Sequence, residues 1–495
     1  MSNVLEKAIA YEKTEGNKIK ASERPAFHLS PKVGWMNDPN GFSCYDGKYH
    51  LFYQYYPYDT QWGPMHWGHA VSEDMIRWSY LPAALAPDSA ADKIGCFSGS
   101  AIQMPDGRQL LLYTGVHKEE EDRADSKDVQ EQCIAFGDGK TYRKYENNPV
   151  ITREMLPPGA SVYDFRDPKI WKEDDGYYCV VGSCTEEKDG QILLFRSPDG
   201  IEWQFEKILI RNNKRFGKMW ECPDFFELDG KQVLITSPQE MLPEGLEFHN
   251  GNGTLYVTGT YGSDHEFLEE SYGTIDYGID FYAPQTTCTA DGRRVMIGWM
   301  QNWDTLSYKP EFPWFGQMSI PRELEVRNGK LWQRPVREIE HYYGRRVEHH
   351  NVKCGERMNL PGIEGRCVDL EISVRPADEK TGYRSFEIRF ADNGTYYVSV
   401  IYDPYASTIQ IDRKHCGTRK ATIHQRRAYV TDKNGEIRLR MIIDRYSAEV
   451  FVNDGEQVLS VTFYTDITAS GIHFTADGEV LFDAVMHELS MEENA

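Results

Sequence analysis

The chain has 495 residues, 55 of them basic and 77 acidic, which gives a formal net charge of −22. This acidic balance argues against nucleic acid or an anionic membrane as a partner. The first 30 residues lack a secretory core and no later run is apolar enough to span a bilayer. We therefore expect a cytoplasmic protein, long enough to contain more than one domain.

An Asp-Gly pair recurs five times in the first two-thirds of the chain, each time before a run rich in apolar residues. The pairs begin at Asp46, Asp106, Asp175, Asp229 and Asp291. Glycine adopts a positive φ without penalty and aspartate tolerates the turn, so each pair predicts a tight hairpin. The spacings of 60, 69, 54 and 62 residues suit four-stranded units, and the repeat predicts a five-bladed β-propeller.

The positions eight residues before each Asp-Gly pair are expected to approach a common axis. They are occupied by Asp38, Ser98, Asp167, Glu221 and Ala283. Three of these side chains are carboxylates, and close like charges repel one another. A cluster of this kind is more typical of a functional site than of a structural one.

The neighbours of these acids suggest different protonation states. Glu221 follows Met219 and Trp220, an apolar setting that favours a protonated general acid, whereas Asp167 follows Arg166, whose charge favours an ionised carboxylate. One acid and two carboxylates form a set suited to glycoside cleavage through an oxocarbenium-like transition state.

Residues beyond about 340 lack tryptophan and alternate between apolar and polar side chains, as in Val368, Leu370, Ile372 and Val374. Short alternating strands over about 150 residues predict a β-sandwich. The expected fold is therefore all-β, with an N-terminal extension at 1–24, a propeller at 25–338 and a sandwich at 350–495. Association of copies through the sandwich is left open.

Several ordered motifs resemble glycoside hydrolase family 32, the family of invertases and fructan hydrolases. They are "HLSPKVGWMNDPNGF", "YHLFYQYYP", "WGHAVSEDMIRW", "FSGS", "FRDPKIW", "WECPDFF", "YGIDFYAPQ" and "MSIPREL". The resemblance implies a retaining β-fructofuranosidase that acts on a small sugar. It further implies that Asp38 is the nucleophile, that Glu221 is the acid/base, and that Asp167 stabilises the transition state.

The resemblance also implies a set of substrate contacts. Matching positions are Asn37, Gln54, Trp62, Phe97, Ser98 and Arg166, together with Tyr282 and Trp299. We expect neither a metal nor a cofactor.

Three alternatives remain open at this point. A fructosyltransferase or an exo-fructanase would use the same fold, an inverting glycosidase would separate its acids more widely, and a non-catalytic sugar-binding propeller would not need the acids. The residues do not decide between sucrose, sucrose 6-phosphate and short fructo-oligosaccharides.

Overall fold

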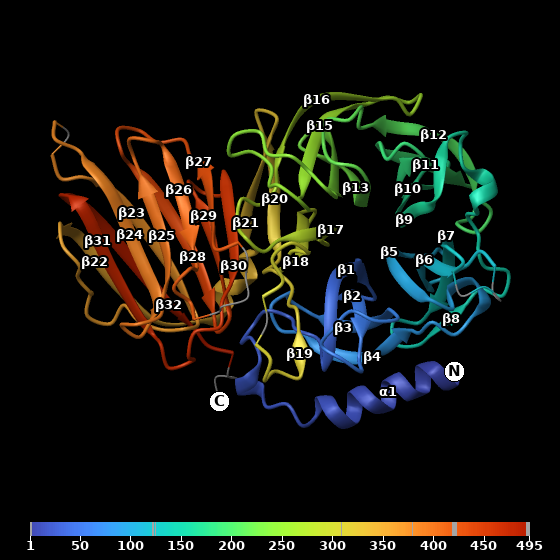
Figure 1. Ribbon diagram of the computed structural model, residues 1–495, viewed down its shortest axis with the longest axis horizontal. Coiled ribbons are helices and arrows are strands. Elements are labelled where there is room, and N and C mark those ends of the chain that lie inside the picture. Colours follow the sequence, from blue (N-terminus) through green and yellow to red (C-terminus); the bar gives the residue numbers. More distant parts are fainter. Residues whose placement is uncertain are drawn as a thin grey trace.

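The computed structural model describes residues 2–120, 123, 125–307, 309–378, 380–417 and 423–491, and most of them form strands (Figure 1). Five sheets form the first part of the chain. Their strands are β1 (Gly34–Tyr45), β2 (Lys48–Tyr56), β3 (His66–Ser72) and β4 (Ser79–Leu85); β5 (Gly95–Gln103), β6 (Gln109–Lys118), β7 (Asp128–Gly137) and β8 (Tyr142–Lys144); β9 (Ala160–Glu173), β10 (Gly176–Thr185), β11 (Gly190–Ser197) and β12 (Gln204–Arg211); β13 (Trp220–Leu228), β14 (Lys231–Pro238), β15 (Leu255–Tyr261) and β16 (Phe267–Thr274); and β17 (Tyr282–Cys288), β18 (Arg294–Trp299), β20 (Arg322–Arg327) and β21 (Lys330–Pro335).

The first strands of the five sheets form a closed ring. Strand β1 contacts β5, β5 contacts β9, β9 contacts β13, β13 contacts β17, and β17 returns to β1. These strands lie innermost in Figure 1. Each Asp-Gly pair lies at the turn between the first and second strand of its sheet. The five-bladed propeller predicted from the repeat is confirmed.

A short additional strand joins the fifth sheet to the first. Strand β19 (Trp314–Phe315) lies in the segment between β18 and β20, yet it pairs with β1 in parallel orientation. Gly34 pairs with Trp314 and Trp35 with Phe315. The segment that follows β18 therefore crosses from the last blade to the first and closes the ring.

Two stacked sheets form the second part of the chain, which confirms the predicted sandwich. Their strands are β22 (Tyr343–Cys354), β23 (Val368–Pro376), β24 (Tyr383–Asp392), β25 (Val398–Asp403), β26 (Thr408–Asp412), β27 (Gln425–Tyr429), β28 (Ile437–Asp444), β29 (Ser447–Val452), β30 (Gln457–Thr462), β31 (Gly471–Gly478) and β32 (Val480–Leu489). Alternate side chains such as Leu370, Ile388 and Phe474 fill the core between the sheets. Strand β22 begins before residue 350, because Tyr343 already pairs with Leu489.

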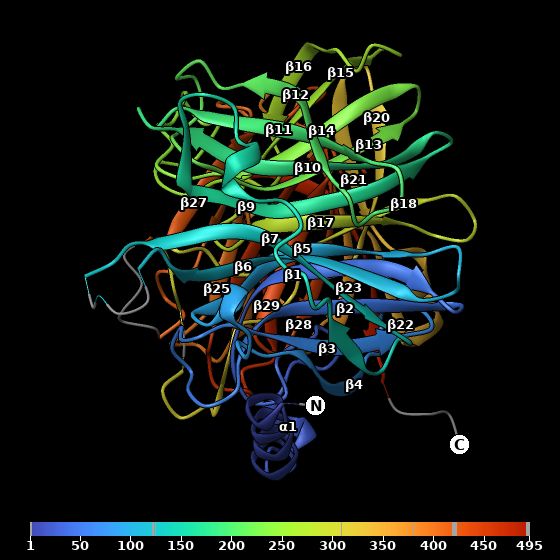
Figure 2. The same cartoon turned by 90° about the vertical axis from the view of Figure 1, so that its right-hand side faces the viewer.

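One α-helix, α1 (Asn3–Gly16), precedes the propeller and lies beside its first sheet (Figure 2). Leu5 and Ala8 are buried, and the Glu12 carboxylate accepts a hydrogen bond of 3.0 Å from the Ala83 amide. The extension at the N-terminus is thereby attached to β4. Within the described residues, no helix combines the length and the apolar character that a membrane crossing requires.

Buried ion pairs join the propeller to the sandwich. Arg322 of β20 contacts Glu449 of β29 at 2.5 Å. The His28 ring lies between Asp444, at 2.8 Å, and Glu449, at 3.0 Å. All of these side chains are fully buried. Removing one partner of a buried pair leaves an uncompensated charge, so these contacts oppose separation of the two parts.

The stability of this junction should depend on pH through His28. Burial lowers the pKa of His28, but Asp444 and Glu449 outweigh that effect and raise the pKa to about 9. A histidine whose folded-state pKa exceeds its unfolded-state value near 6.5 stabilises the fold fully below that pH. We expect the free energy of unfolding to fall by on the order of 3 kcal/mol as the pH rises from about 6.5 to 9.

Urea unfolding measured across this pH range checks the expectation. His28→Gln should remove most of the fall, whereas His350→Gln, which changes an exposed histidine, should retain it. An equal pH dependence in wild type and His28→Gln would contradict the account.

Candidate active site

The first strands of the propeller are irregular where they approach the channel. In β1 the pairing with β2 is interrupted between Met36 and Pro39, and in β13 the pairing with β14 is interrupted between Glu221 and Asp224. Strands β5, β9 and β17 have corresponding interruptions. A bulge leaves residues unpaired and redirects their side chains. The residues eight positions before the Asp-Gly turns lie within or beside these breaks.

Four of the five residues at these breaks, the three acids and Ser98, line one cavity of about 480 Å³. Of the residues proposed from the sequence, those that line it are Asn37, Asp38, Gln54, Trp62, Phe97, Ser98, Arg166, Asp167 and Glu221. The volume lies within the usual range for a small-molecule site. The three acids proposed for catalysis are therefore brought together from three different blades.

Asp38 is held by donors on both of its oxygen atoms. Asn37 donates to Oδ1 at 3.0 Å, and the Ser98 hydroxyl donates to Oδ2 at 2.8 Å. The Trp35 indole in turn donates to the Asn37 side chain at 2.7 Å and fixes its orientation. Burial raises the pKa of Asp38 and the charge of Glu221 raises it further, while the two donors act in the opposite direction.

Asp167 is also perturbed by its surroundings. Burial raises the pKa of Asp167 to about 7, and the charges of Glu221 and Asp38 act in the same direction. Arg166 lowers the pKa but lies 4.0 Å from the carboxylate. The Cys222 amide donates to Oδ2 at 3.0 Å. Arg166 thus favours the ionised carboxylate, as the sequence predicts, but burial outweighs its effect.

Glu221 is the acid that Arg166 actually binds. Nε and Nη2 of Arg166 donate to Oε1 at 3.0 and 2.9 Å. The Tyr282 hydroxyl lies 2.6 Å from Oε2 and 3.0 Å from the Ser237 carbonyl. The Gln130 side chain accepts a further bond from Arg166 at 3.1 Å.

The apolar setting predicted for Glu221 is therefore wrong. Met219 and Trp220 are buried, and Trp220 belongs to a hydrophobic cluster rather than to the cavity. Successive side chains of a strand point to opposite faces, so chain neighbours need not be spatial neighbours.

Two residues proposed as sugar contacts do not line the cavity. Trp299 is fully buried, and the centre of its ring lies 5.0 Å from that of Trp303. Trp303, rather than Trp299, lines the cavity. Tyr282 is also buried and reaches the site through Glu221. Lining residues that the sequence reasoning missed are Gln130, Asp164, Gln239, Asn252 and Trp303. None of them lies eight residues before one of the five Asp-Gly pairs of the repeat, so the repeat did not indicate them.

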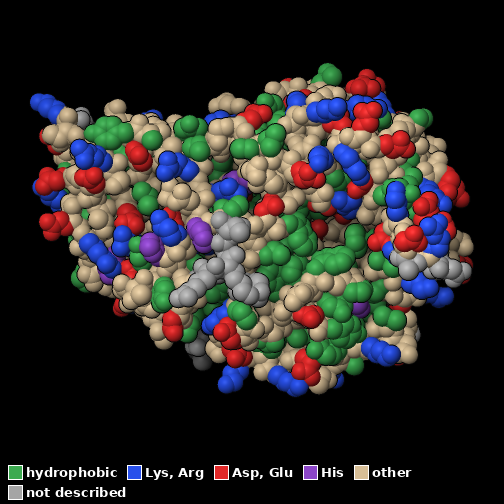
Figure 3. All heavy atoms as spheres, viewed as in Figure 1, with side chains coloured by type: hydrophobic (Ala, Val, Ile, Leu, Met, Phe, Trp, Pro, Cys, Tyr) green, Lys and Arg blue, Asp and Glu red, His purple; other side chains and the backbone are tan. Residues whose placement is uncertain are grey.

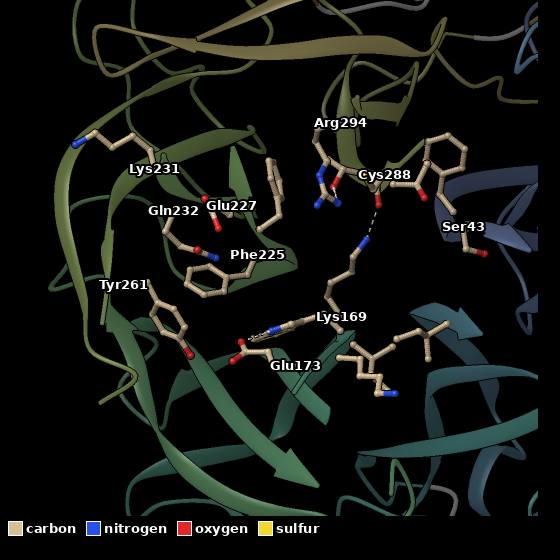
Figure 4. Close-up of a pocket in the computed structure, with 18 of the residues that line it drawn as sticks. Ser43, Lys169, Glu173, Phe225, Glu227, Lys231, Gln232, Tyr261, Cys288 and Arg294 are labelled. Atoms are coloured by element: carbon tan, nitrogen blue, oxygen red, sulfur yellow. Dashed lines mark hydrogen bonds between the residues drawn. The ribbon is translucent and has the colours of Figure 1, made fainter. Parts of the chain in front are cut away.

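A larger cavity of about 1020 Å³ has a different lining (Figure 4). It includes Lys169, Glu173 and Arg294 but none of the site residues proposed from the sequence. Figure 4 shows Lys169 extending toward the strand that carries Cys288, and its ammonium donates to the Thr286 carbonyl at 2.7 Å. The three acids proposed for catalysis therefore lie in the smaller of these two cavities.

Hydrogen bonds between the first strands cross the region between the two cavities. Gln285 of β17 donates to the Gly99 carbonyl of β5 at 2.7 Å. Lys169 of β9 contacts Asp224 of β13 at 2.9 Å as well as Thr286 of β17. The two cavities have no lining residue in common. The acids therefore lie in a cavity that is lined separately from the larger one.

Comparisons with known proteins identify the family of the chain. The model named "Glycosyl hydrolases family 32 N-terminal domain" matches residues 28–335, and "Glycosyl hydrolases family 32 C terminal" matches residues 338–491. The chain belongs to glycoside hydrolase family 32. Its enzymatic class is accordingly that of a β-fructofuranosidase, a glycosidase.

Relatives within family 32 cover most of the chain. A sucrose-6-phosphate hydrolase of Escherichia coli is 36% identical over 442 residues, which is 89% of each chain. A raffinose invertase of Escherichia coli is 36% identical over 444 residues, again 89% of each chain. The solved structure of a mutant Bombyx mori β-fructofuranosidase in complex with sucrose superimposes with a TM-score of 0.83 at 33% identity, covering 98% of this chain and 97% of the other.

Trp303 lines the cavity and Trp299 does not, so we expect different effects when each is substituted. Trp303→Ala should raise KM for sucrose about fivefold, since an aromatic contact contributes about 1 kcal/mol. Trp299→Phe, the matched control, should leave KM within about twofold because the side chain does not line the cavity. Steady-state kinetics check both variants. A larger rise in KM for Trp299→Phe, at unchanged melting temperature, would contradict the assignment.

Proposed function

We propose that the chain removes terminal β-D-fructofuranosyl units from small sugars by double displacement, with Asp38 as nucleophile and Glu221 as acid/base. The observation that carries the proposal is the convergence of Asp38, Asp167 and Glu221 in one cavity. Sucrose, which bears one terminal fructosyl unit, is the simplest substrate of this kind.

In the first displacement a carboxylate oxygen of Asp38 attacks the anomeric carbon of the fructosyl unit. The bond to the leaving oxygen breaks, and the proton of Glu221 passes to that oxygen. The hydrogen bonds from Asn37 and Ser98 favour the ionised form of Asp38 that this step requires. In the second displacement Glu221 takes a proton from water, the water oxygen attacks the same carbon, and Asp38 is released.

Asp167 is proposed to bind hydroxyl groups of the fructosyl ring. The Cys222 amide is its one backbone donor among the described hydrogen bonds, and the rest of the carboxylate borders the cavity. Hydrogen bonds to a carboxylate strengthen as positive charge develops on the sugar ring, so this contact would stabilise the transition state more than the bound substrate.

Tyr282 is proposed to support both protonation states of Glu221. A phenol has a single proton and can also accept a hydrogen bond. Its oxygen lies 2.6 Å from Glu221 Oε2 and 3.0 Å from the Ser237 carbonyl oxygen, which can only accept. When Glu221 is protonated, Tyr282 donates to Ser237 and accepts from Glu221. When Glu221 is ionised, the phenol donates to it instead, with no movement of heavy atoms.

Removal of the phenol should therefore affect the ionised form of Glu221 most strongly. Tyr282→Phe should lower kcat for sucrose about tenfold or more, because a hydrogen bond to a charged group contributes about 1.5–3 kcal/mol. The alkaline limb of the kcat/KM profile should move to higher pH, because the basic form loses its donor. A pH profile unchanged in shape, with lower activity throughout, would show that the phenol acts only by packing.

The stereochemistry of the first product tests the double displacement directly. Two inversions at the anomeric carbon restore the starting configuration, so real-time NMR of sucrose hydrolysis should show β-fructofuranose before mutarotation. Methanol should intercept the intermediate and give methyl β-fructofuranoside. The amount of fructosylated sugar formed at high sucrose concentration would measure the share of turnovers that end in transfer rather than hydrolysis.

An α-anomer released first, with no methyl fructoside, would mean that water attacks directly. Asp38 would then act as a general base, and the proposed roles would be wrong although the fold and family stand.

A further inference from the structure

The lining of the active-site cavity is strongly acidic. Its described residues include four carboxylates, those of Asp38, Asp164, Asp167 and Glu221, and a single cation, Arg166. Arg166 is already engaged: its guanidinium lies 2.9 Å from Glu221, 3.7 Å from Asp164 and 4.0 Å from Asp167. No described cation of this lining is therefore left for an anionic substrate.

Two described lysines that border the lining, Lys188 and Lys218, are also paired with acids. Lys188 contacts Asp164 at 2.6 Å. Lys218 donates its backbone amide to the carbonyl of Gln239, a lining residue, while its ammonium contacts Glu240 at 2.5 Å. Lys and Arg are likewise interspersed with Asp and Glu over the face shown in Figure 3, rather than gathered in one patch.

The remaining lining side chains are neutral. Trp62 and Trp303 contribute aromatic faces, and Gln239 and Asn252 contribute amides. Trp62 is 49% exposed, as expected of a residue at a mouth rather than at the base. Amides bind sugar hydroxyl groups as both donors and acceptors, and indole rings pack against the apolar face of a sugar ring.

A phosphorylated substrate would place its charge among these neutral and acidic groups. In sucrose 6-phosphate the phosphate is on the glucosyl unit, which is the leaving group and lies toward the mouth when the fructosyl unit contacts the acids. A phosphate monoester carries a charge of about −1.5 to −2 at pH 7 and is usually bound by Arg or Lys. Like charges placed together across a binding surface cost several kcal/mol.

We propose that the leaving-group side of this cavity selects uncharged sugars, so that the substrates are unphosphorylated fructosides. The inference rests on the proposed function and adds the substrate class. The specificity has two sources. Arg166, Lys188 and Lys218 are already paired with acids, so that no cation among them is left for the phosphate, and the amide and indole groups bind hydroxyl groups instead.

The direct test is the ratio of kcat/KM for sucrose and for sucrose 6-phosphate at pH 7 and low ionic strength. Sucrose should be favoured about tenfold or more, and the ratio should narrow at high salt because screening weakens the repulsion. A ratio near one, or a preference for the phosphate ester, would overturn the inference and leave the proposed function standing. Failure to hydrolyse either sugar would overturn both.

A charge placed at the mouth provides a second test. Gln239→Arg should raise kcat/KM for sucrose 6-phosphate relative to sucrose by about fivefold, since it supplies the missing cation. Gln239→Met, the matched control, removes the same amide without adding charge and should leave the ratio within about twofold. An equal change of the ratio in both variants would show that charge at the mouth does not set the specificity.

Discussion

Electrostatic repulsion among Asp38, Asp167 and Glu221 is the constraint that the rest of the site must satisfy. Three carboxylates cannot share a small buried space unless donors or cations compensate them, because the protein interior screens charge poorly. Here Asn37 and Ser98 donate to Asp38, a backbone amide donates to Asp167, and Arg166 and Tyr282 bind Glu221. Burial, assisted by the charges of Glu221 and Asp38, keeps the pKa of Asp167 near 7 rather than near 4.

The sandwich contributes to this arrangement although it lines no part of the cavity. Arg413 of the sandwich contacts Asp280 of the propeller at 2.5 Å, and both are fully buried. Asp280 also accepts from Thr305 at 3.0 Å, and the Thr305 amide donates to the Asn302 carbonyl. Asn302 directly precedes Trp303, which lines the cavity. A buried ion pair at the junction thus supports the loop that forms one wall of the cavity.

The sequence was sufficient to predict the architecture and the convergence of the three acids in one cavity, because both depend on local signals. An Asp-Gly turn is a short-range feature of the sequence. Because each bulge lies at or beside the position eight residues before its turn, the turns also indicate which side chains face the channel. The contacts of Arg166 could not be predicted in the same way: its chain neighbour is Asp167, but its guanidinium crosses to Glu221 on the next blade. Trp303 was missed for Trp299 because it lies on an irregular loop, where no periodicity indicates which ring faces the cavity.

The central claim is that Asp38 forms a covalent bond to the fructosyl unit, and the adduct itself can be sought. The Glu221→Gln variant should react with β-fructofuranosyl fluoride, whose leaving group needs no protonation, but should hydrolyse the intermediate slowly because the base is lost. After an acid quench, peptide mapping by mass spectrometry should place a fructosyl group on Asp38, and the double variant that also carries Asp38→Asn should have none. Turnover of the fluoride with no adduct, or an adduct on Asp167, would contradict the account.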